Sequence, residues 1–230
     1  MIFRGLQRTT LIDYPGHLAA TFFVDKCNFR CPFCHNPLLV FEKEKNEISE
    51  KEALEFLKKR KKYIEGICIT GGEPTLHPGL KFFIRQVKDL GLKVKLDSNG
   101  TSPALLRELI DEKLVDYIAM DVKAPLEKYD LATNVHTDLE AIKKSIALLK
   151  EGRVAYEFRA TVVPGIIEPE DIKKMGELLK GAEKFSFQQF SNHGPLVDKK
   201  FEKLNPYPLE TLKEMAKEME KYVKKVELRA

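Results

Sequence analysis

The chain has 230 residues, of which 43% are hydrophobic and 32% are charged, so it contains ample apolar residues for the core of one large α/β domain. Its net charge of +4 neither demands a nucleic acid nor forbids an acidic protein partner. No apolar run approaches the ~20 residues of a membrane span, and the first residues lack the apolar core of a secretory signal. We therefore expect a cytoplasmic protein that binds neither a membrane nor nucleic acid.

Segments typical of buried strands alternate along the chain with amphipathic helical segments. Strands are predicted at 18–25, 66–70, 92–97, 115–121, 155–163 and 184–190. One helix is predicted from Ser49, which stands in capping-box spacing with Glu52. Further helices are predicted at 79–90, 103–113, 139–151, 169–180 and 208–224.

This β-α alternation predicts a parallel sheet with helices outside it and right-handed crossovers. A full eight-fold barrel usually needs ~250 residues, so the pattern predicts an α/β fold with a partial, open (β/α)6 TIM-like barrel. A doubly wound open sheet is the competing arrangement. We expect one domain over 1–230, with an N-terminal extension at 1–17, a βα core at 18–190, and a C-terminal loop and helix at 191–230.

Polar or glycine-containing segments follow the first five predicted strands. In chain order they are a cysteine-rich loop, GGEP, DSNG, DVK and VVPG. Active sites in parallel α/β proteins are built at the carboxyl ends of the strands. The pattern therefore favours the barrel and predicts that these loops converge on one mouth.

Three of the four cysteines lie in the segment KCNFRCPFCHN with the spacing C-x3-C-x2-C, at Cys27, Cys31 and Cys34. In the cytosol such a group indicates metal ligands or redox catalysts rather than structural disulfides. A zinc site would need a fourth ligand, but His35 directly follows Cys34, and Cys68 lies in an apolar run where it suits a core. A [4Fe–4S] cube usually takes four thiolates, so three would leave one iron open to a substrate.

The cysteine spacing, with aromatic Phe33 before the third cysteine, resembles the signature of the radical S-adenosylmethionine (SAM) enzymes. The signature is specific when it follows the first strand of a βα chain and GGEP follows the second. The resemblance implies a [4Fe–4S] cluster whose open iron chelates the amino and carboxylate groups of SAM. It also implies reductive cleavage of SAM to methionine and a 5′-deoxyadenosyl radical, which abstracts a hydrogen atom.

The GGEP segment, with Gly71, Gly72 and Glu73, resembles the family's motif for the amino group of SAM. An ammonium needs hydrogen-bond acceptors. A Gly-Gly turn exposes backbone carbonyls, and Glu73 adds a carboxylate. The alternative is an ordinary turn between a strand and a helix.

Two further segments resemble motifs of the activases of glycyl-radical enzymes. In LDSNG, the resemblance implies that Asp97, Ser98 and Asn99 bind ribose hydroxyls or a cation, whereas the alternative is an Asn-Gly turn that closes a strand. In AMDVK, it implies that Asp121 joins Asp97 in a monovalent cation site and that Lys123 lies near the methionine carboxylate. The alternative is an ordinary solvated rim.

The segment FRATVVPG matches the R-x-x-V-V-P-G pattern of these activases. Arg159 lies in an apolar strand, where a charge is costly unless it is paired. Its partner could be SAM or an internal carboxylate, Asp97 or Asp121. Phe190 stands where the pyruvate formate-lyase activase has a histidine that touches adenine, and His193 lies in the following loop, so the adenine contacts stay open.

Two segments narrow the resemblance to one group of activases. CPFCHNP, with His35 and Asn36, resembles the C-x-x-C-H-N of glycyl-radical activases, and TTLIDYPGHLAATFF resembles the start of anaerobic ribonucleotide reductase activating proteins. The implied partners are a glycyl-radical enzyme, first of all the anaerobic ribonucleotide reductase, and flavodoxin or ferredoxin as electron donor. A small-molecule enzyme like 7-carboxy-7-deazaguanine synthase and a non-enzymatic iron–sulfur or metal-binding protein remain as alternatives.

Two loops carry expectations of their own. The turn Tyr14-Pro15-Gly16 and the segment after Phe190 are candidates for the rim of the mouth, because polar loops with Pro and Gly suit exposed recognition surfaces. The alternative is that Pro15 only interrupts the chain before the first strand. The cysteine loop is expected to be disordered without its cluster, since few apolar residues are available to hold it.

Overall fold

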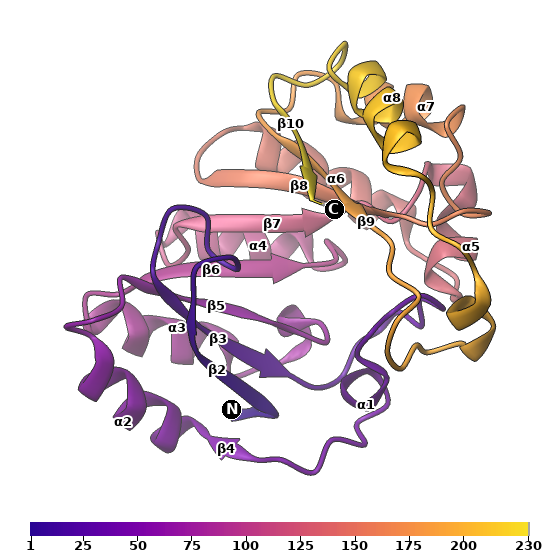
Figure 1. Cartoon of the computed structure of the whole chain (residues 1–230). Helices are drawn as coiled ribbons and strands as arrows, with labels where there is room; N and C mark the ends of the chain where they lie inside the picture. The colour runs from indigo at the N-terminus through magenta and orange to yellow at the C-terminus, as the bar shows by residue number, and fades with distance from the viewer. Residues whose placement is uncertain (230) are drawn as a thin grey trace. The chain divides into compact units, whose positions relative to one another are not determined.

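The computed structural model describes residues 1–229 and has an α/β fold whose strands are mostly parallel (Figure 1). The chain divides into two compact units, and the division runs through β7 (Tyr117–Asp121). Unit 1 contains Met1–Asn28, Leu38–Ala119 and Arg153–Ala155, and unit 2 contains Phe29–Pro37, Met120–Gly152 and the chain from Tyr156 onward. Within residues 1–229, no helix has both the length and the apolar character that a membrane span requires.

The sheet of unit 1 has the strand order β6–β5–β3–β2. Its parallel strands are β3 (Ala19–Val24), β5 (Gly66–Gly71) and β6 (Lys93–Ser98). The edge strand β2 (Gly5–Thr10) pairs antiparallel with β3, and a small second sheet pairs β1 (Ile2–Phe3) with β4 (Ile48–Ser49). The parallel order places the carboxyl ends of β3, β5 and β6 at one edge of this sheet.

Helices cover one face of the unit 1 sheet (Figure 1). They are α2 (Glu50–Arg60), α3 (Leu80–Asp89) and α4 (Pro103–Asp111), with a short 3-10 turn, η1 (Pro74–Leu76), after β5. The predicted capping box begins α2, because the Ser49 side chain accepts a hydrogen bond from the Glu52 backbone N–H and the Glu52 side chain accepts one from Ser49. The helix α1 (Pro37–Val40) follows the cysteine loop.

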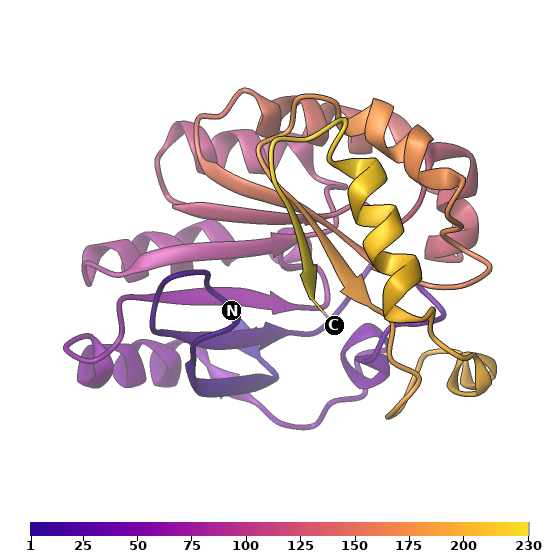
Figure 2. The same cartoon turned by 45° about the horizontal axis from the view of Figure 1, so that its top comes forward.

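The sheet of unit 2 contains β8 (Ala155–Val162), β9 (Phe185–Gln189) and β10 (Val226–Arg229), which run parallel in that order. The helices are α5 (Tyr129–Thr133), α6 (Leu139–Lys150), α7 (Asp171–Leu179) and α8 (Leu209–Met219), with 3-10 turns η2 (Leu126–Lys128) and η3 (Lys199–Lys203). Figures 1 and 2 show α7 and α8 side by side, and α8 packs against β9 and β10.

The predicted strands and helices of the βα core are all present, with ends that differ by a few residues. The last helix is shorter than predicted, Leu209–Met219 instead of 208–224, and the strand β10 follows it. Sequence reasoning missed β10 and placed β2 in an extension. Both are edge strands with few buried side chains, so their sequences lack the apolar pattern of an internal strand.

The Tyr14-Pro15-Gly16 turn lies at the amino ends of the unit 1 strands. Tyr14 packs against Tyr117, which begins β7, with tilted rings whose centroids are 6.2 Å apart. His17 pairs with Glu65, the residue before β5, at 2.7 Å. The prediction that this turn borders the mouth is therefore wrong, because the predicted site residues follow the opposite ends of these strands.

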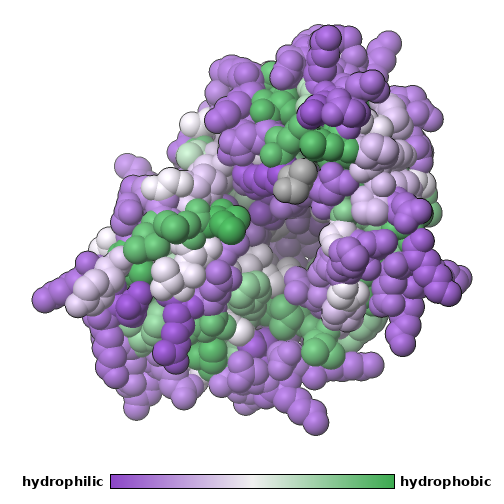
Figure 3. Space-filling view, in the orientation of Figure 1, coloured by the Kyte–Doolittle hydropathy of each residue, from purple (hydrophilic) through white to green (hydrophobic). Residues whose placement is uncertain are grey.

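The same loop carries two exposed apolar side chains. Leu11 is 75% exposed and Ile12 is 86% exposed, and the Thr10 hydroxyl accepts hydrogen bonds from the backbone N–H groups of Ile12 and Asp13. Figure 3 shows apolar side chains over this segment, one of several apolar patches on this face.

Candidate functional site

Glu73 joins the loops that follow β5 and β6 in unit 1. Its side chain is buried, with 1% of the residue exposed. Oε1 accepts hydrogen bonds from the Thr75 backbone N–H at 3.1 Å, the Thr75 hydroxyl at 2.5 Å and the Ser98 hydroxyl at 2.9 Å. Oε2 accepts one from the Asn99 backbone N–H at 2.6 Å. The carboxylate therefore holds the DSNG loop against the GGEP loop.

The partners of Glu73 are all neutral. Burial raises the pKa of Glu73 above its ordinary value, and the hydrogen bonds from Thr75, Asn99 and Ser98 act in the opposite direction. The sequence predicted this carboxylate as an acceptor for an ammonium group. Its contacts give it a second role that the sequence did not reveal, as a brace between two loops.

The two glycines of GGEP pack closely against the segment that leads into Cys27. Gly71 has φ of +113°, and a Cβ there would lie 2.5 Å from the Val24 carbonyl oxygen. A Cβ on Gly72 would lie 2.2 Å from the Lys26 carbonyl oxygen. Any other residue would displace the backbone just before the first cysteine, so the glycines are required for this fit.

The residues before Cys27 are fixed from several sides. The Asp25 carboxylate accepts a hydrogen bond from Arg4 Nε at 2.5 Å, and the Asp25 carbonyl lies 2.9 Å from His77 Nε2. Lys26 has φ of +61°, an uncommon conformation for a residue with a Cβ, and its N–H donates to the Leu39 carbonyl at 2.9 Å. These contacts determine the direction in which the chain enters the cysteine loop.

Asn28, directly after Cys27, connects the cysteine loop to the DSNG loop. Its Oδ1 accepts a hydrogen bond from Asn99 Nδ2 at 2.7 Å, and its Nδ2 donates to the Thr101 hydroxyl at 3.0 Å. Sequence reasoning missed Asn28. Its position next to Cys27 is the only feature of the sequence that could have indicated a role in the site. The contact gives Asn99 a structural role in addition to its predicted role in binding SAM.

In unit 2, the cysteine loop forms a tight turn in which the Cys34 N–H donates to the Cys31 carbonyl at 3.0 Å. The Val197 N–H donates to the Cys34 carbonyl at 3.1 Å, and the Asp198 N–H donates to the Pro32 carbonyl at 2.9 Å. Phe33 is buried, as is Phe29. The expectation that too few apolar residues hold this loop is therefore wrong, because two phenylalanines and the segment before η3 hold it.

The residues that follow the third cysteine are exposed. His35 Nε2 lies 3.0 Å from the Ser191 carbonyl, a further contact between this loop and the segment after β9. Asn36 is exposed. Phe190 is buried with 1% exposure, and His193 lies in an exposed loop, where its N–H donates to the Ser191 hydroxyl.

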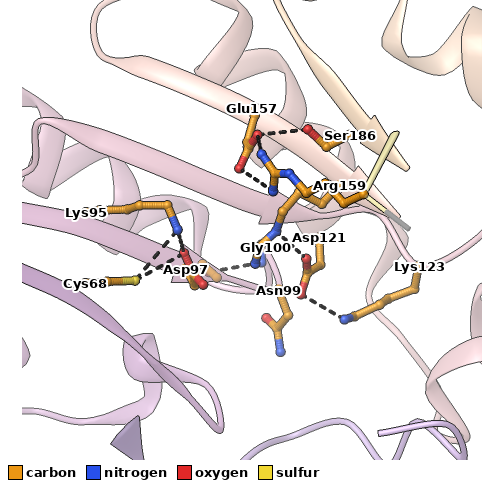
Figure 4. A network of polar contacts seen from close by, with 12 residues as sticks. Cys68, Lys95, Asp97, Asn99, Gly100, Asp121, Lys123, Glu157, Arg159 and Ser186 are labelled. Atoms are coloured by element: carbon orange, nitrogen blue, oxygen red, sulfur yellow. Dashed lines mark hydrogen bonds and ion pairs between the residues drawn. The ribbon is translucent and has the colours of Figure 1, made fainter. Parts of the chain in front are cut away.

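Asp121 stands between two cationic side chains of unit 2. Arg159 Nε donates to its Oδ1 at 3.0 Å, and Lys123 Nζ donates to its Oδ2 at 3.0 Å. Burial raises the pKa of Asp121, but the charges of Arg159 and Lys123 outweigh this and lower it to about 2. Of the two internal partners predicted for Arg159, unit 2 contains Asp121. Figure 4 shows both contacts.

The cysteines of unit 2 lie in the field of an ammonium group. Burial lowers the pKa of Lys123, whereas the charges of Asp121, Cys31 and Cys34 raise it, and the net change is upward. Among residues 1–229, the cysteines form no disulfides, and no three His, Cys, Asp or Glu side chains are grouped closely enough for a single metal ion. A cubane cluster is larger than one ion, and Cys31 and Cys34 lie on one hydrogen-bonded turn of unit 2.

Asp97 in unit 1 is paired with Lys95, two residues earlier on β6 (Figure 4). Cys68 Sγ lies 3.7 Å from Lys95 Nζ and 3.7 Å from Asp97 Oδ1. Cys68 is buried in the core, as predicted, but its polar contacts were not predicted. The two carboxylates that the resemblance assigned to a monovalent cation, Asp97 and Asp121, each have a cationic partner within their own unit, so this part of the predicted cofactor set does not fit.

The chain resembles known proteins over most of its length. The Radical SAM superfamily model matches residues 21–179. A Methanocaldococcus jannaschii protein, assigned by its name as a glycyl-radical enzyme activating enzyme, is 36% identical over 233 residues, which cover 98% of this chain and 94% of that protein. The pyruvate formate-lyase-activating enzyme of Clostridium pasteurianum is 26% identical over 244 residues, with 96% of each chain covered.

A solved structure shows the same fold. SuiB of Streptococcus suis, bound to the precursor peptide SuiA, matches with a TM-score of 0.69 and 15% identity over 90% of this chain. The match covers 47% of SuiB, so this chain spans about half the length of that protein. Radical SAM enzymes have a partial TIM barrel, and the fold class predicted from the sequence is thereby confirmed over the doubly wound alternative. The chain belongs to the radical SAM superfamily and is an enzyme of the glycyl-radical enzyme activating type.

Proposed function

We propose that the enzyme cleaves SAM reductively and abstracts a hydrogen atom from a glycine of the anaerobic ribonucleotide reductase. The observation that carries this proposal is the cysteine loop, whose entry is fitted against the GGEP glycines and whose turn is hydrogen-bonded to the 197–198 segment. A loop held in this way presents thiols from fixed backbone positions. The sequence around it, CPFCHNP, is of the activase type.

Cys27, Cys31 and Cys34 are the proposed ligands of a [4Fe–4S] cluster. When bound, the cluster supplies the electron that cleaves SAM. The chain's own contribution is to fix the direction of the loop at Asp25 and Lys26 and to place the positive charge of Lys123 near Cys31 and Cys34. We assign the electron donor to a reduced flavodoxin or ferredoxin.

We propose that different residues bind the two charged groups of the methionine part of SAM. Asp121, Lys123 and Arg159 together carry one net positive charge, which suits the methionine carboxylate. The carbonyls of Gly71 and Gly72 suit the ammonium group, and Glu73 keeps their loop in place. The further proposed SAM contacts are Phe33, His35, Asn36, Asp97, Ser98 and Asn99.

The anaerobic ribonucleotide reductase is proposed as the partner because the segment TTLIDYPGHLAATFF resembles its activating proteins. Part of this segment forms the turn at the amino ends of the unit 1 strands, so its sequence is not explained by contacts to SAM. Our proposal includes a cytoplasmic location and a single radical SAM domain over 1–230. It does not include a monovalent cation.

The partner is tested by electron paramagnetic resonance. Reconstituted protein, SAM and dithionite are mixed with the anaerobic ribonucleotide reductase of the source organism. We expect the doublet of a glycyl radical, and none when the radical-bearing glycine of the reductase is replaced by alanine. A doublet on a different glycyl-radical enzyme alone would reassign the partner. SAM cleavage with no radical on any of them would favour the small-molecule alternative.

A further inference from the structure

Lys95 is a buried lysine in the middle of β6. Only 2% of the residue is exposed. The strand alternates its side chains, so Lys95 and Asp97 lie on one face while Val94 and Leu96 lie on the other. Burial of an ammonium group costs free energy unless the group is paired. The role of the Lys95 charge therefore depends on the groups that it contacts.

The partners of Lys95 follow from strand register. Lys95 is the register partner of Cys68 on β5, and Asp97 is two residues along on the same face. The Lys95 ammonium donates to Asp97 Oδ1, and both groups lie 3.7 Å from Cys68 Sγ. The three side chains form a small group in unit 1, in which Lys95 and Cys68 are buried and Asp97 is partly exposed (Figure 4).

The charges leave little for a bound cation to neutralise. The Lys95 ammonium balances the Asp97 carboxylate, whereas Asp121 in unit 2 has two cationic partners, Lys123 and Arg159. A hard cation binds where oxygen ligands carry uncompensated negative charge. An added potassium or sodium ion would be repelled by ammonium or guanidinium groups at either carboxylate.

We propose that this enzyme holds no monovalent cation at Asp97 or Asp121 and that the Lys95 ammonium supplies the positive charge at Asp97 instead. An ammonium carries the same charge as a potassium ion and is similar in size, and here it is tethered to the strand. Lys95 is thus a positioning residue: it fixes Asp97 at the end of β6. Its consequence for SAM rests on the proposed function, but its effect on cation binding does not.

The direct test is thermal unfolding without SAM, in potassium chloride and in tetramethylammonium chloride at equal ionic strength. Tetramethylammonium is too large for a compact oxygen site. A bound cation stabilises the folded chain by mass action, so a site saturated by potassium would raise Tm by roughly 3 °C or more. We expect the same Tm for the wild type in both salts. A potassium-specific rise in the wild type would overturn the proposal.

Variants test whether Lys95 takes the place of the ion. Lys95→Met removes the ammonium that pairs with Asp97 and so lowers the positive charge beside this carboxylate. We therefore expect a lower Tm that potassium restores by roughly 3 °C or more. Lys93→Met, an exposed lysine on the same strand, should show no potassium effect. If Lys95→Met does not fold, Lys95→Gln, which retains a hydrogen-bond donor, replaces it. A folded variant at Lys95 with no potassium effect would contradict the assignment.

Calorimetry with the reconstituted protein measures whether Lys95 also affects SAM binding. The wild type should bind SAM with the same Kd in both salts, within about two-fold. The Lys95 variant should bind SAM about ten-fold more weakly in tetramethylammonium than in potassium. Absence of SAM binding under all conditions would reject the proposed function and leave the result on the cation site unaffected.

Discussion

Glu73 shows how one buried carboxylate organises the candidate site. It accepts hydrogen bonds from Thr75, Ser98 and Asn99, and only 1% of the residue is exposed. A shortened side chain would leave several buried donors without an acceptor. Each such group costs roughly 1–3 kcal/mol. The stability of the two loops therefore depends on this residue before any ligand is considered.

Replacement of Glu73 should weaken both folding and SAM binding. We expect Glu73→Ala to lower the free energy of unfolding by at least roughly 1–3 kcal/mol and SAM binding by roughly 1.5–3 kcal/mol. Urea unfolding and calorimetry measure the two effects. The control is Glu65→Ala, an exposed carboxylate at the amino end of β5, which should cost less than about 1 kcal/mol. Equal losses in the two variants would show that Glu73 braces nothing.

The cysteines differ in their predicted contributions to the iron site. Anaerobically reconstituted protein should carry about four irons per chain. Alanine at Cys27, Cys31 or Cys34 should remove most of the iron, whereas Cys68→Ala should retain it, because Cys68 is buried beside Lys95 and Asp97. Iron analysis and visible absorption measure the difference. A dispensable member of the three, together with an essential Cys68, would overturn the ligand set.

At the scale of elements, Glu157 connects the strands of unit 2. It lies on β8, is fully buried, and pairs with Arg229 on β10 at 2.7 and 3.2 Å. Ser186 on β9 donates a hydrogen bond to it at 2.9 Å, and Lys184 lies 3.2 Å away. Burial raises the pKa of Glu157, but the positive charges of Arg229, Arg159 and Lys184 lower it by more. The net change in the pKa of Glu157 is therefore downward.

This pKa has a consequence for pH dependence. A carboxyl whose pKa is lowered by folding stabilises the protein above its ordinary pKa of 4.5 and loses this contribution as the pH falls below it. Arg229→Met should therefore lower the free energy of unfolding by roughly 2 kcal/mol at pH 7 and by less near pH 4. Urea unfolding at both pH values measures this. Lys225→Met, an exposed control, should change little. An equal loss at both pH values would show that the charge of Glu157 is not the cause.

At the scale of the whole molecule, apolar periodicity was sufficient to predict the βα core, and the polar segments after the strands favoured the barrel over a doubly wound sheet. It did not predict the short edge strand β10, whose sequence VELR is half charged. It also did not predict which face of β6 is buried. KVKLDS alternates apolar and polar side chains, and only the packed structure shows that Lys95 is buried as fully as its apolar neighbours.

The candidate site was predictable where short motifs carry it and unpredictable where contacts between distant residues do. The cysteines, GGEP and DSNG were found from the sequence. The brace from Glu73 to Asn99 and the contact from Asn28 to Asn99 join residues 26 and 71 positions apart, and no local pattern indicates them. The role of the Tyr14-Pro15-Gly16 turn was misjudged because sequence gives the order of loops and not the end of the sheet at which they lie.

The central claim is that this chain removes a hydrogen atom from a glycine of its partner. Anaerobic ribonucleotide reductase labelled with α-deuterated glycine can be incubated with reconstituted protein, SAM and dithionite, and the 5′-deoxyadenosine then analysed by mass spectrometry. We predict that deuterium appears in the 5′-deoxyadenosine, and that it is absent when the radical-bearing glycine of the reductase is replaced by alanine. Formation of 5′-deoxyadenosine without deuterium, with this and every other labelled glycyl-radical enzyme, would contradict the account.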